Sequence, residues 1–245
     1  MTKTFFGKIS ILLPAYNEEG HIFENIKEVY RTFLDLGYNF EIIVLDDGSS
    51  DATFSELEKA KELFPELQIK KNLSNFGKGR ALKKAFRYCK GDYVVFLDSD
   101  MDLHPLQIKT FFDIMELDNA DVVIGSKRHP NSVLNYPWHR RLVSSIYFFL
   151  VKILFGLPIR DTQTGLKLFK YEVLAKAFPR VLVKKFAFDL ELLVNIHHLG
   201  YKIAEAPVRV DSKRKFGRIG VSSIMHTFWD TLAIWYRMYI LKYYD

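Results

Sequence analysis

The chain has 245 residues, 49% of them hydrophobic, so it is long enough for one large domain or two small ones and too apolar to be disordered. A net charge of +6 and an isoelectric point near 9.1 favour an anionic partner: a phosphorylated substrate, a nucleic acid or an acidic membrane surface. The single cysteine, Cys89, excludes an internal disulfide and fits a reducing compartment.

The first half of the chain alternates short apolar runs with amphipathic segments. The apolar runs predict strands at residues 8–13, 40–45, 68–71, 93–97 and 122–124. The amphipathic segments predict helices at residues 22–36 and 79–88, a helix capped by Ser50 or Asp51, and a helix beginning at Pro105. This alternation predicts an α/β fold, with a mostly parallel sheet covered by helices on both faces.

The second half is less regular. A strand is expected near residues 202–210, followed by a basic loop and a C-terminal amphipathic helix in residues 221–245. An apolar segment at residues 142–159 is interrupted by Lys152, and the C-terminal segment carries Asp230, Arg237 and Lys242. Neither reaches the roughly 18 uninterrupted apolar residues of a membrane span, so both are expected to be interfacial or buried helices. No secretory signal is expected either.

Three polar clusters directly follow predicted strands: PAYNEEG at residues 14–20, DDGSSDAT at 46–53 and DSDMD at 98–102. In parallel sheets the carboxyl ends of the strands share one edge, and ligands bind there. We therefore expect the three clusters to face a common cleft.

The last cluster places three acids, Asp98, Asp100 and Asp102, at the end of an apolar strand. A calcium loop of the EF-hand type would need Gly and Glu at its sixth and twelfth positions, which hold Leu103 and Lys109. A helix cap would use one acid, not three. Carboxylates suit Mg²⁺ or Mn²⁺, which also bind substrate phosphates, so a metal site that holds a diphosphate is favoured. On an extended chain all three carboxylates would face the same side, but a turn after Asp100 would change that.

Asp46 and Asp47 end the second predicted strand, where a carboxylate can accept hydrogen bonds from a nucleotide base or ribose. A dinucleotide dehydrogenase also places an acid there. That fold requires a glycine-rich loop after its first strand. Here the loop is PAYNEEG, and the nearest glycine-rich fragment, at residues 77–79, is short and comes later. The dehydrogenase interpretation is therefore disfavoured.

Four motifs in this order, LPAYNEEG, VLDDGSSD, NFGKGRALKKAF and FLDSDMDLHP, resemble the family 2 glycosyltransferases with the GT-A, Rossmann-like fold. In the second half, GSKRHPNS, IRDTQTGLKLFK and FAFDLELL resemble the polyprenyl-phosphate glycosyltransferases. Within that group the dolichyl-phosphate β-glucosyltransferases are most similar, and the dolichol-phosphate mannose synthases are close relatives. The resemblance covers about residues 9–220.

The resemblance implies roles for individual residues. A nucleotide-sugar site would be formed by Pro14, Tyr16, Glu18, Asp46, Asp47, Lys78, Asp98, Arg214 and Arg218. The metal, Mg²⁺ or Mn²⁺, would be bound by Asp100 and Asp102. The catalytic group would comprise Asp98, Asp100, Arg128 and Asp161, although Asp161 could also be a turn acid paired with Arg160. In relatives a Ser-Lys pair follows the glycine of the loop that closes over the donor; here Arg218-Ile219-Gly220 replaces it, which leaves the basic partner open.

The implied activity is inverting transfer of a hexose from a nucleoside-diphosphate sugar, UDP-glucose first, to a polyprenyl (dolichyl) phosphate. GDP-mannose or UDP-N-acetylglucosamine as donor, and a saccharide as acceptor, are alternatives. Residues 1–220 would form the catalytic domain, and residues 221–245 a helix that faces a membrane or another subunit. The expected location is the cytoplasmic face of a membrane, with peripheral attachment. The alternative from another class is a non-catalytic basic module that binds membranes or nucleic acid. The three acidic loops argue against it, because without a metal they would repel a phosphate backbone.

Overall fold

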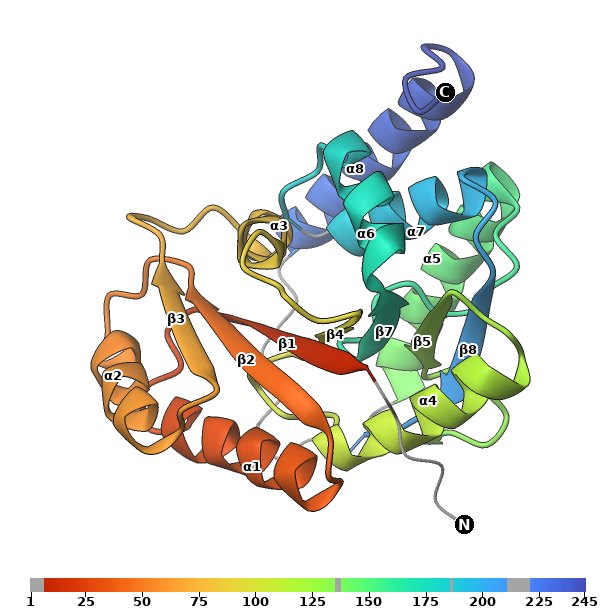
Figure 1. Ribbon diagram of the computed structural model, residues 1–245. Coiled ribbons are helices and arrows are strands. Elements are labelled where there is room, and N and C mark those ends of the chain that lie inside the picture. Colours follow the sequence, from red (N-terminus) through yellow and green to blue (C-terminus); the bar gives the residue numbers. More distant parts are fainter. Residues whose placement is uncertain (1–6, 135–137, 186, 211–220) are drawn as a thin grey trace.

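The computed structural model describes residues 7–134, 138–185, 187–210 and 221–245. Within these residues a seven-stranded sheet has the order β3-β2-β1-β4-β7-β5-β8 (Figure 1). Its strands are β1 (Lys8–Ala15), β2 (Asn39–Asp46), β3 (Leu67–Lys71), β4 (Tyr93–Phe96), β5 (Val122–Ser126), β7 (Lys167–Lys170) and β8 (Ile203–Pro207). All pairs are parallel except those of β7, which runs antiparallel to both β4 and β5. The predicted mostly parallel α/β sheet is confirmed.

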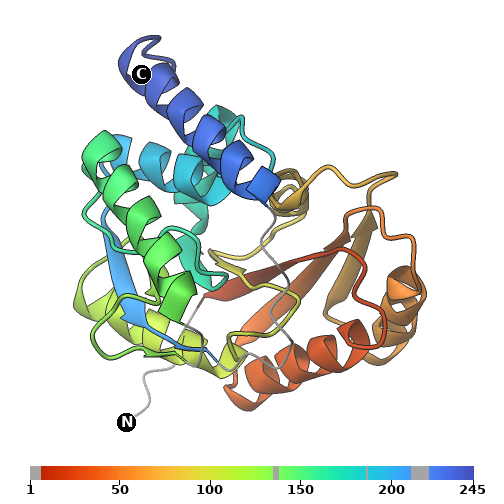
Figure 2. The same ribbon diagram turned by 180° about the vertical axis from the view of Figure 1, so that it is seen from behind.

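Helices cover both faces of the sheet (Figures 1 and 2). On one face lie α1 (Ile22–Asp35), α2 (Thr53–Leu63) and α4 (Ile108–Leu117). On the other lie α3 (Lys78–Phe86), α5 (Trp138–Phe155), α6 (Tyr171–Ala177), α7 (Phe188–His198) and α8 (Val221–Tyr239). Two short 3₁₀ turns, η1 (Pro105–Gln107) and η2 (Phe178–Arg180), precede α4 and follow α6. No helix among the described residues has the length and apolar character needed to cross a membrane.

The two hydrophobic cores follow from strand alternation. In β1, Ile9 and Ile11 pack toward α1 and α4, whereas Leu12 packs toward α3 and α7, because successive side chains of a strand point to opposite faces. In α1, Ile22 and Ile26 begin a buried stripe with the helical spacing of three and four residues. These patterns explain why the first half of the fold could be predicted.

Three details differ from the predictions. The N-cap of α2 is Ala52, and Asp51 instead accepts the N–H of Thr53 at 3.0 Å. The predicted strand at 202–210 is divided into β8 and β9 (Arg209–Val210), which pairs with β6 (Val133–Leu134) in a separate two-stranded sheet. The antiparallel strand β7 was not predicted, because it is only four residues long and has lysines at both ends.

Candidate active site

The loops after β1 and β2 are joined by hydrogen bonds at the shared sheet edge. Asn17 donates its N–H to the Ser49 hydroxyl (3.0 Å) and accepts from the Ser50 N–H (3.0 Å). Glu19 accepts from the Ala52 N–H (2.9 Å). Part of the polar character of these two motifs therefore holds the loops together. Their common position confirms the predicted edge, since β1 lies parallel to both β2 and β4.

Three predicted nucleotide-binding residues lie in or after the end of β1. Pro14 is in register with Leu45 of β2, and Tyr16 is 45% exposed. Glu18 donates its backbone N–H to the Thr53 hydroxyl (2.7 Å). This bond sets the course of the loop and leaves Tyr16 accessible at the edge of the sheet.

Asp47 is buried and holds the loop that leads into α3. Its carboxylate accepts from Asn72 Nδ2 (2.7 Å), the Phe76 N–H (3.1 Å) and the Gly77 N–H (2.7 Å). Gly48 follows with a φ of +77°, and a Cβ there would lie 2.5 Å from the backbone of the same loop. The DDG motif therefore requires glycine for close backbone approach as well as for its turn.

Asp46, the neighbour of Asp47, has a free acceptor. The residue is fully buried, and its Oδ1 accepts the N–H of Ser49 (2.9 Å). Its Oδ2 has no hydrogen bond among the described residues, and Lys71 Nζ lies 3.8 Å away. A buried oxygen without a hydrogen bond is costly.

The chain turns within the DSDMD motif. Met101 has a φ of +56° and donates its N–H to the Asp98 carbonyl (3.4 Å). Asp102 donates its N–H to Asp100 Oδ1 (3.2 Å). The three acids therefore lie on a turn and not along an extended strand, so their carboxylates are not constrained to one side.

A chain of alternating charges begins at the partly exposed pair of Lys78 and Asp98 and ends at the buried pair of Lys167 and Asp189. Lys78 Nζ lies 2.6 Å from Asp98 Oδ1 and 4.0 Å from Asp189 Oδ2, and Lys167 Nζ lies 2.6 Å from Asp189 Oδ1. The four residues come from the end of β4 and the starts of α3, α7 and β7. Burial alone would raise the pKa of Asp98, but the nearby lysines, Lys78 first and then Lys167 and Lys127, hold it below its ordinary value. Asp98 is therefore ionised and its charge is balanced.

Asp100 is in the opposite electrostatic state. Burial, together with the carboxylates of Asp98 and Asp102, raises the pKa of Asp100 to about 6. A cation would relieve this repulsion, so the residues present fit a divalent metal held by Asp100 and Asp102. No group of three or more His, Cys, Asp or Glu side chains in the described part of the chain is arranged to hold a metal. Two carboxylates suit Mg²⁺ or Mn²⁺, which take their other ligands from phosphate and water.

The RDTQTG motif packs against this cluster. A Cβ on Gly165 would lie 2.2 Å from Asp98 Oδ2, so only glycine allows this approach. Asp161 Oδ2 accepts from the Lys127 N–H (3.1 Å) and the Thr164 hydroxyl (2.7 Å). Arg160 does not pair with Asp161; its Nε lies 3.8 Å from Glu205. Asp161 thus fixes the segment that leads to residue 128.

The predicted basic residues are placed differently from one another. Lys78 contacts Asp98 directly, whereas Arg128 donates to the Ser145 hydroxyl of α5 (3.0 Å) and its guanidinium lies 4.9 Å from the Phe148 ring centre. Arg214 and Arg218 lie outside the described residues. The chain enters that segment from β9, where Val210 bridges to Leu103, the residue after Asp102.

Residues 10–178 match the sequence pattern of Glycosyl transferase family 2. The chain belongs to this family. A dolichyl-phosphate beta-glucosyltransferase of Dictyostelium discoideum is 31% identical over 214 residues, 82% of this chain and 65% of that protein. Glycosyltransferase AglD of Haloferax volcanii is 28% identical over 91% of this chain and 37% of its own length. The chain thus spans about two thirds or less of these relatives.

Solved structures show the same fold. A glucosyl-3-phosphoglycerate synthase of Mycobacterium tuberculosis, in complex with Mn²⁺, UDP and glucosyl-3-phosphoglycerate, has a TM-score of 0.69 at 23% identity, over 94% of this chain and 79% of that one. The mannosyltransferase PcManGT of Pyrobaculum calidifontis, with GDP-Man and Mn²⁺, has a TM-score of 0.65 at 20% identity, over 97% and 65%. The GT-A fold expected for a family 2 chain is confirmed.

Sequence reasoning missed three charged residues of this family 2 site. Lys127 lies close enough to Asp98 to lower its pKa, and Lys167 and Asp189 form a buried pair. The signal was a charged residue in an apolar setting: Lys167 lies in KLFK, and Asp189 in FAFDLELL. Lysine and aspartate are rarely buried without a partner, but the sequence does not identify which residue pairs with which.

Proposed function

We propose that this chain is an inverting glycosyltransferase that moves glucose from UDP-glucose to a polyprenyl phosphate of the dolichyl type. The observation that carries the proposal is the arrangement at the edge of the sheet. Lys78, which pairs with Asp98, is partly exposed there, and Asp100 has an excess of negative charge around it. A divalent cation would supply positive charge to Asp100 and Asp102, and a diphosphate would bind both that cation and Lys78. The similarity to a dolichyl-phosphate beta-glucosyltransferase supports the sugar and the acceptor.

The donor would lie across the edge from β2 to β4. The base and ribose are enclosed by the adjoining loops, which contain Pro14, Tyr16, Glu18, Asp46 and Asp47. Lys78 meets the diphosphate, and Arg128 supports it from the side of β5. Arg214 and Arg218 complete the site in this proposal. Asp100 and Asp102 would hold Mg²⁺ or Mn²⁺, which when bound supplies positive charge to the leaving diphosphate.

The proposed reaction is a single displacement at the anomeric carbon. An oxygen of the acceptor phosphate attacks from the face opposite the diphosphate; the new C–O bond forms as the bond to the diphosphate breaks, and the configuration inverts to β. The nucleophile is already anionic near neutral pH, so the site does not need a strong general base. The transition state has oxocarbenium character. Lys78 and Arg128 stabilise the charge that gathers on the leaving group, and Asp161 orients the acceptor side by fixing the segment before Arg128.

A lipid acceptor requires access to a membrane surface, and two helices offer one. Ile146, Phe149 and Ile153 of α5 share one face and are 60–81% exposed. On α8, Trp229 is 62% and Tyr236 49% exposed. The helices are linked by a bond between the Tyr147 and Thr231 hydroxyls (3.2 Å). Aromatic and apolar side chains on an amphipathic helix suit the bilayer interface, so we assign peripheral attachment, on the cytoplasmic side, to this surface.

The activity is tested with polyprenyl phosphate, Mg²⁺ and, in separate reactions, UDP-glucose, GDP-mannose and UDP-N-acetylglucosamine. We expect labelled lipid with UDP-glucose, and a β anomer by NMR of the product. Labelling with another donor would correct the sugar, and failure of every donor would overturn the acceptor assignment. An α-linked product would overturn the inverting mechanism.

The surface is tested by flotation with vesicles of phosphatidylcholine and phosphatidylglycerol. Replacing Ile146 and Ile153 with Ser should release the protein from the vesicles. A wild-type protein that stays unbound and sediments as a dimer would instead assign these faces to contact between subunits.

A further inference from the structure

A buried carboxylate on α7 connects the end of the chain to the loop beside Lys78. Glu191 is fully buried, and its Oε1 accepts from Arg237 Nη2 of α8 (2.9 Å) and from the Tyr244 hydroxyl. Its Oε2 accepts the N–H groups of Leu182 (2.8 Å) and Val183 (2.6 Å). One carboxylate thus joins α8, the residues after it and the loop between η2 and α7.

Tyr244 is held in this group through both its hydroxyl and its backbone carbonyl. It is 1% exposed, and besides its bond to Glu191 its hydroxyl accepts from Arg237 Nε (2.9 Å). Its backbone carbonyl accepts from Arg180 Nη1 (3.1 Å). A phenol held by two charged partners in a buried position is costly to leave unbonded. The residues after α8 are therefore fixed by specific bonds and not by apolar packing alone.

The loop at residues 181–185, which Glu191 holds, is in turn hydrogen-bonded to α3. The Lys184 carbonyl accepts the N–H groups of Gly79 (3.0 Å) and Arg80 (3.4 Å), and the Val181 carbonyl accepts from Lys83 Nζ (3.0 Å). A Cβ on Gly77 would lie 2.7 Å from the Lys184 carbonyl oxygen. The loop at residues 181–185 therefore determines where α3 begins. Lys78 is the first residue of that helix.

We infer that Glu191, Arg237 and Tyr244 form a latch that positions Lys78 for the diphosphate of the donor. The inference rests on the proposed function, because it takes the ligand of Lys78 to be a nucleoside diphosphate. Tyr244 is a positioning residue: it touches no substrate and acts through Glu191, the 181–185 loop and the start of α3. Each link in this path is a hydrogen bond between described residues, so the path can be broken one bond at a time.

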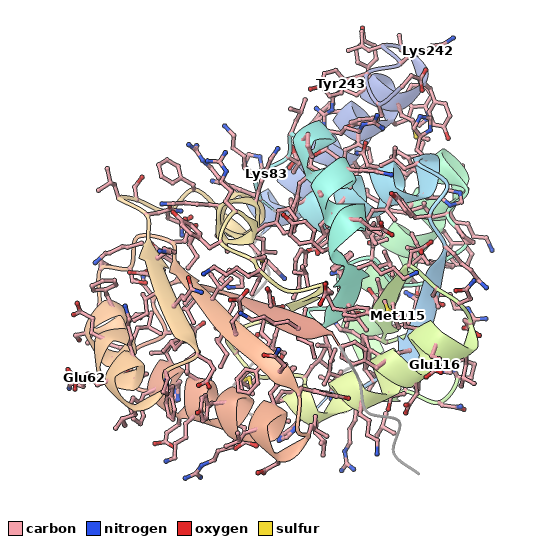
Figure 3. The ribbon with its side chains drawn as sticks, viewed as in Figure 1. Glu62, Lys83, Met115, Glu116, Lys242 and Tyr243 are labelled. Carbon is pink, nitrogen blue, oxygen red and sulfur yellow. The ribbon has the colours of Figure 1, made fainter. Side chains whose placement is uncertain are left out.

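The test compares Tyr244→Phe with Tyr243→Phe. Both substitutions remove one hydroxyl, but Tyr243 is 48% exposed at the same end of the chain (Figure 3). Two quantities are measured: amide hydrogen exchange, and the affinity for UDP with Mn²⁺. For Tyr244→Phe we expect exchange about tenfold faster at Leu182, Val183, Gly79 and Arg80, and UDP affinity about fivefold weaker, with no change for Tyr243→Phe. The donor KM should rise while the acceptor KM is unchanged.

A double variant tests whether Tyr244 positions Lys78 or only stabilises α8. In a Lys78→Met background, Tyr244→Phe should cause no further loss of UDP affinity, because the residue it positions is gone. Faster exchange confined to α8, with UDP affinity intact, would overturn the inference. A wild-type protein that binds no UDP would overturn the proposed function and the nucleotide role of the latch together; exchange at Gly79 and Arg80 would still decide whether the latch holds α3.

Discussion

Two neighbouring regions of the site hold their carboxylates by different means. In the loops after β1 and β2, Asp47 and Asp51 are satisfied by backbone N–H groups, a side-chain amide and a hydroxyl. At the junction of β4, α3, α7 and β7, Asp98 and Asp189 are satisfied by the ammonium groups of lysines. The first arrangement fixes loops, whereas the second runs from a partly exposed ion pair, Lys78 and Asp98, to a buried one, Lys167 and Asp189. In the proposed function the second region is the one that meets the diphosphate.

Asp100 differs from the acids of both arrangements. Burial and the carboxylates of Asp98 and Asp102 oppose its charge, and the Asp102 N–H and Lys78 offset this only in part. Charged groups in such surroundings are typical of functional sites, since stability alone would not select them. Asp100 should therefore be important for activity and unimportant for folding, unlike the lysine-paired acids beside it.

The largest expected effect is that of Asp100→Ala. We expect transfer to fall at least a hundredfold, as when a group that supports transition-state charge is removed, while Tm is unchanged or slightly raised because repulsion is relieved. Initial rates at saturating donor and thermal unfolding measure the two effects. Glu62→Ala, which removes an exposed acid of α2 (Figure 3), should change neither. A rate within threefold of wild type would show that the metal role of Asp100 is wrong.

The next largest effect concerns the lysine-paired acids. Lys167→Met leaves Asp189 buried without its closest partner, which costs about 3–5 kcal/mol and lowers Tm by roughly 6–20 °C. Replacing Asp189 with Leu as well should recover at least half of the loss, because no charge of the pair then remains buried. Lys109→Met, at an exposed position of α4, is the control. A shift below about 2 °C for Lys167→Met would contradict the buried-pair interpretation.

The same two regions show how far the sequence could predict the site. The strands and the shared edge were predictable, because apolar runs and the polar residues after them are local signals. The sequence predicted the same nucleotide-binding role for Asp46 and Asp47, yet their surroundings differ. The loop at residues 72–77 donates hydrogen bonds to Asp47, whereas Asp46 Oδ2 accepts none among the described residues. That distinction depends on a segment some 25 residues away, which no local pattern encodes.

The charged junction was less predictable for the same reason. Lys167 and Asp189 are 22 residues apart, and Glu191 and Tyr244 are 53 apart. The first pairing depends on the antiparallel insertion of β7 between β4 and β5, which a four-residue strand with terminal lysines did not indicate. The second depends on the contact of the residues after α8 with α7. The structure brings the RDTQTG motif against Asp98, but the partners of each charge came only from the fold.

The smallest expected effect concerns Glu41 of β2, which combines both means of holding a carboxylate. It accepts from Lys8 Nζ (2.8 Å), the Ser10 hydroxyl (2.6 Å) and the Lys90 N–H (2.6 Å). Burial alone would raise the pKa of Glu41, but these bonds hold it below the ordinary value. A lowered folded-state pKa means that ionised Glu41 stabilises the fold above its ordinary pKa, about 4.3, and that this contribution is lost as the pH falls through the folded value.

Glu41→Gln should therefore lower Tm at pH 7 by about 2–4 °C, which corresponds to about 1 kcal/mol for a chain of this size. The deficit should shrink below pH 4, because wild-type Glu41 then becomes protonated and loses the same advantage. Thermal unfolding of both proteins between pH 7 and pH 3 measures it, with Glu62→Gln as the exposed control. A deficit that stays constant over this range would mean that hydrogen-bond geometry, and not the charge of Glu41, stabilises the strand.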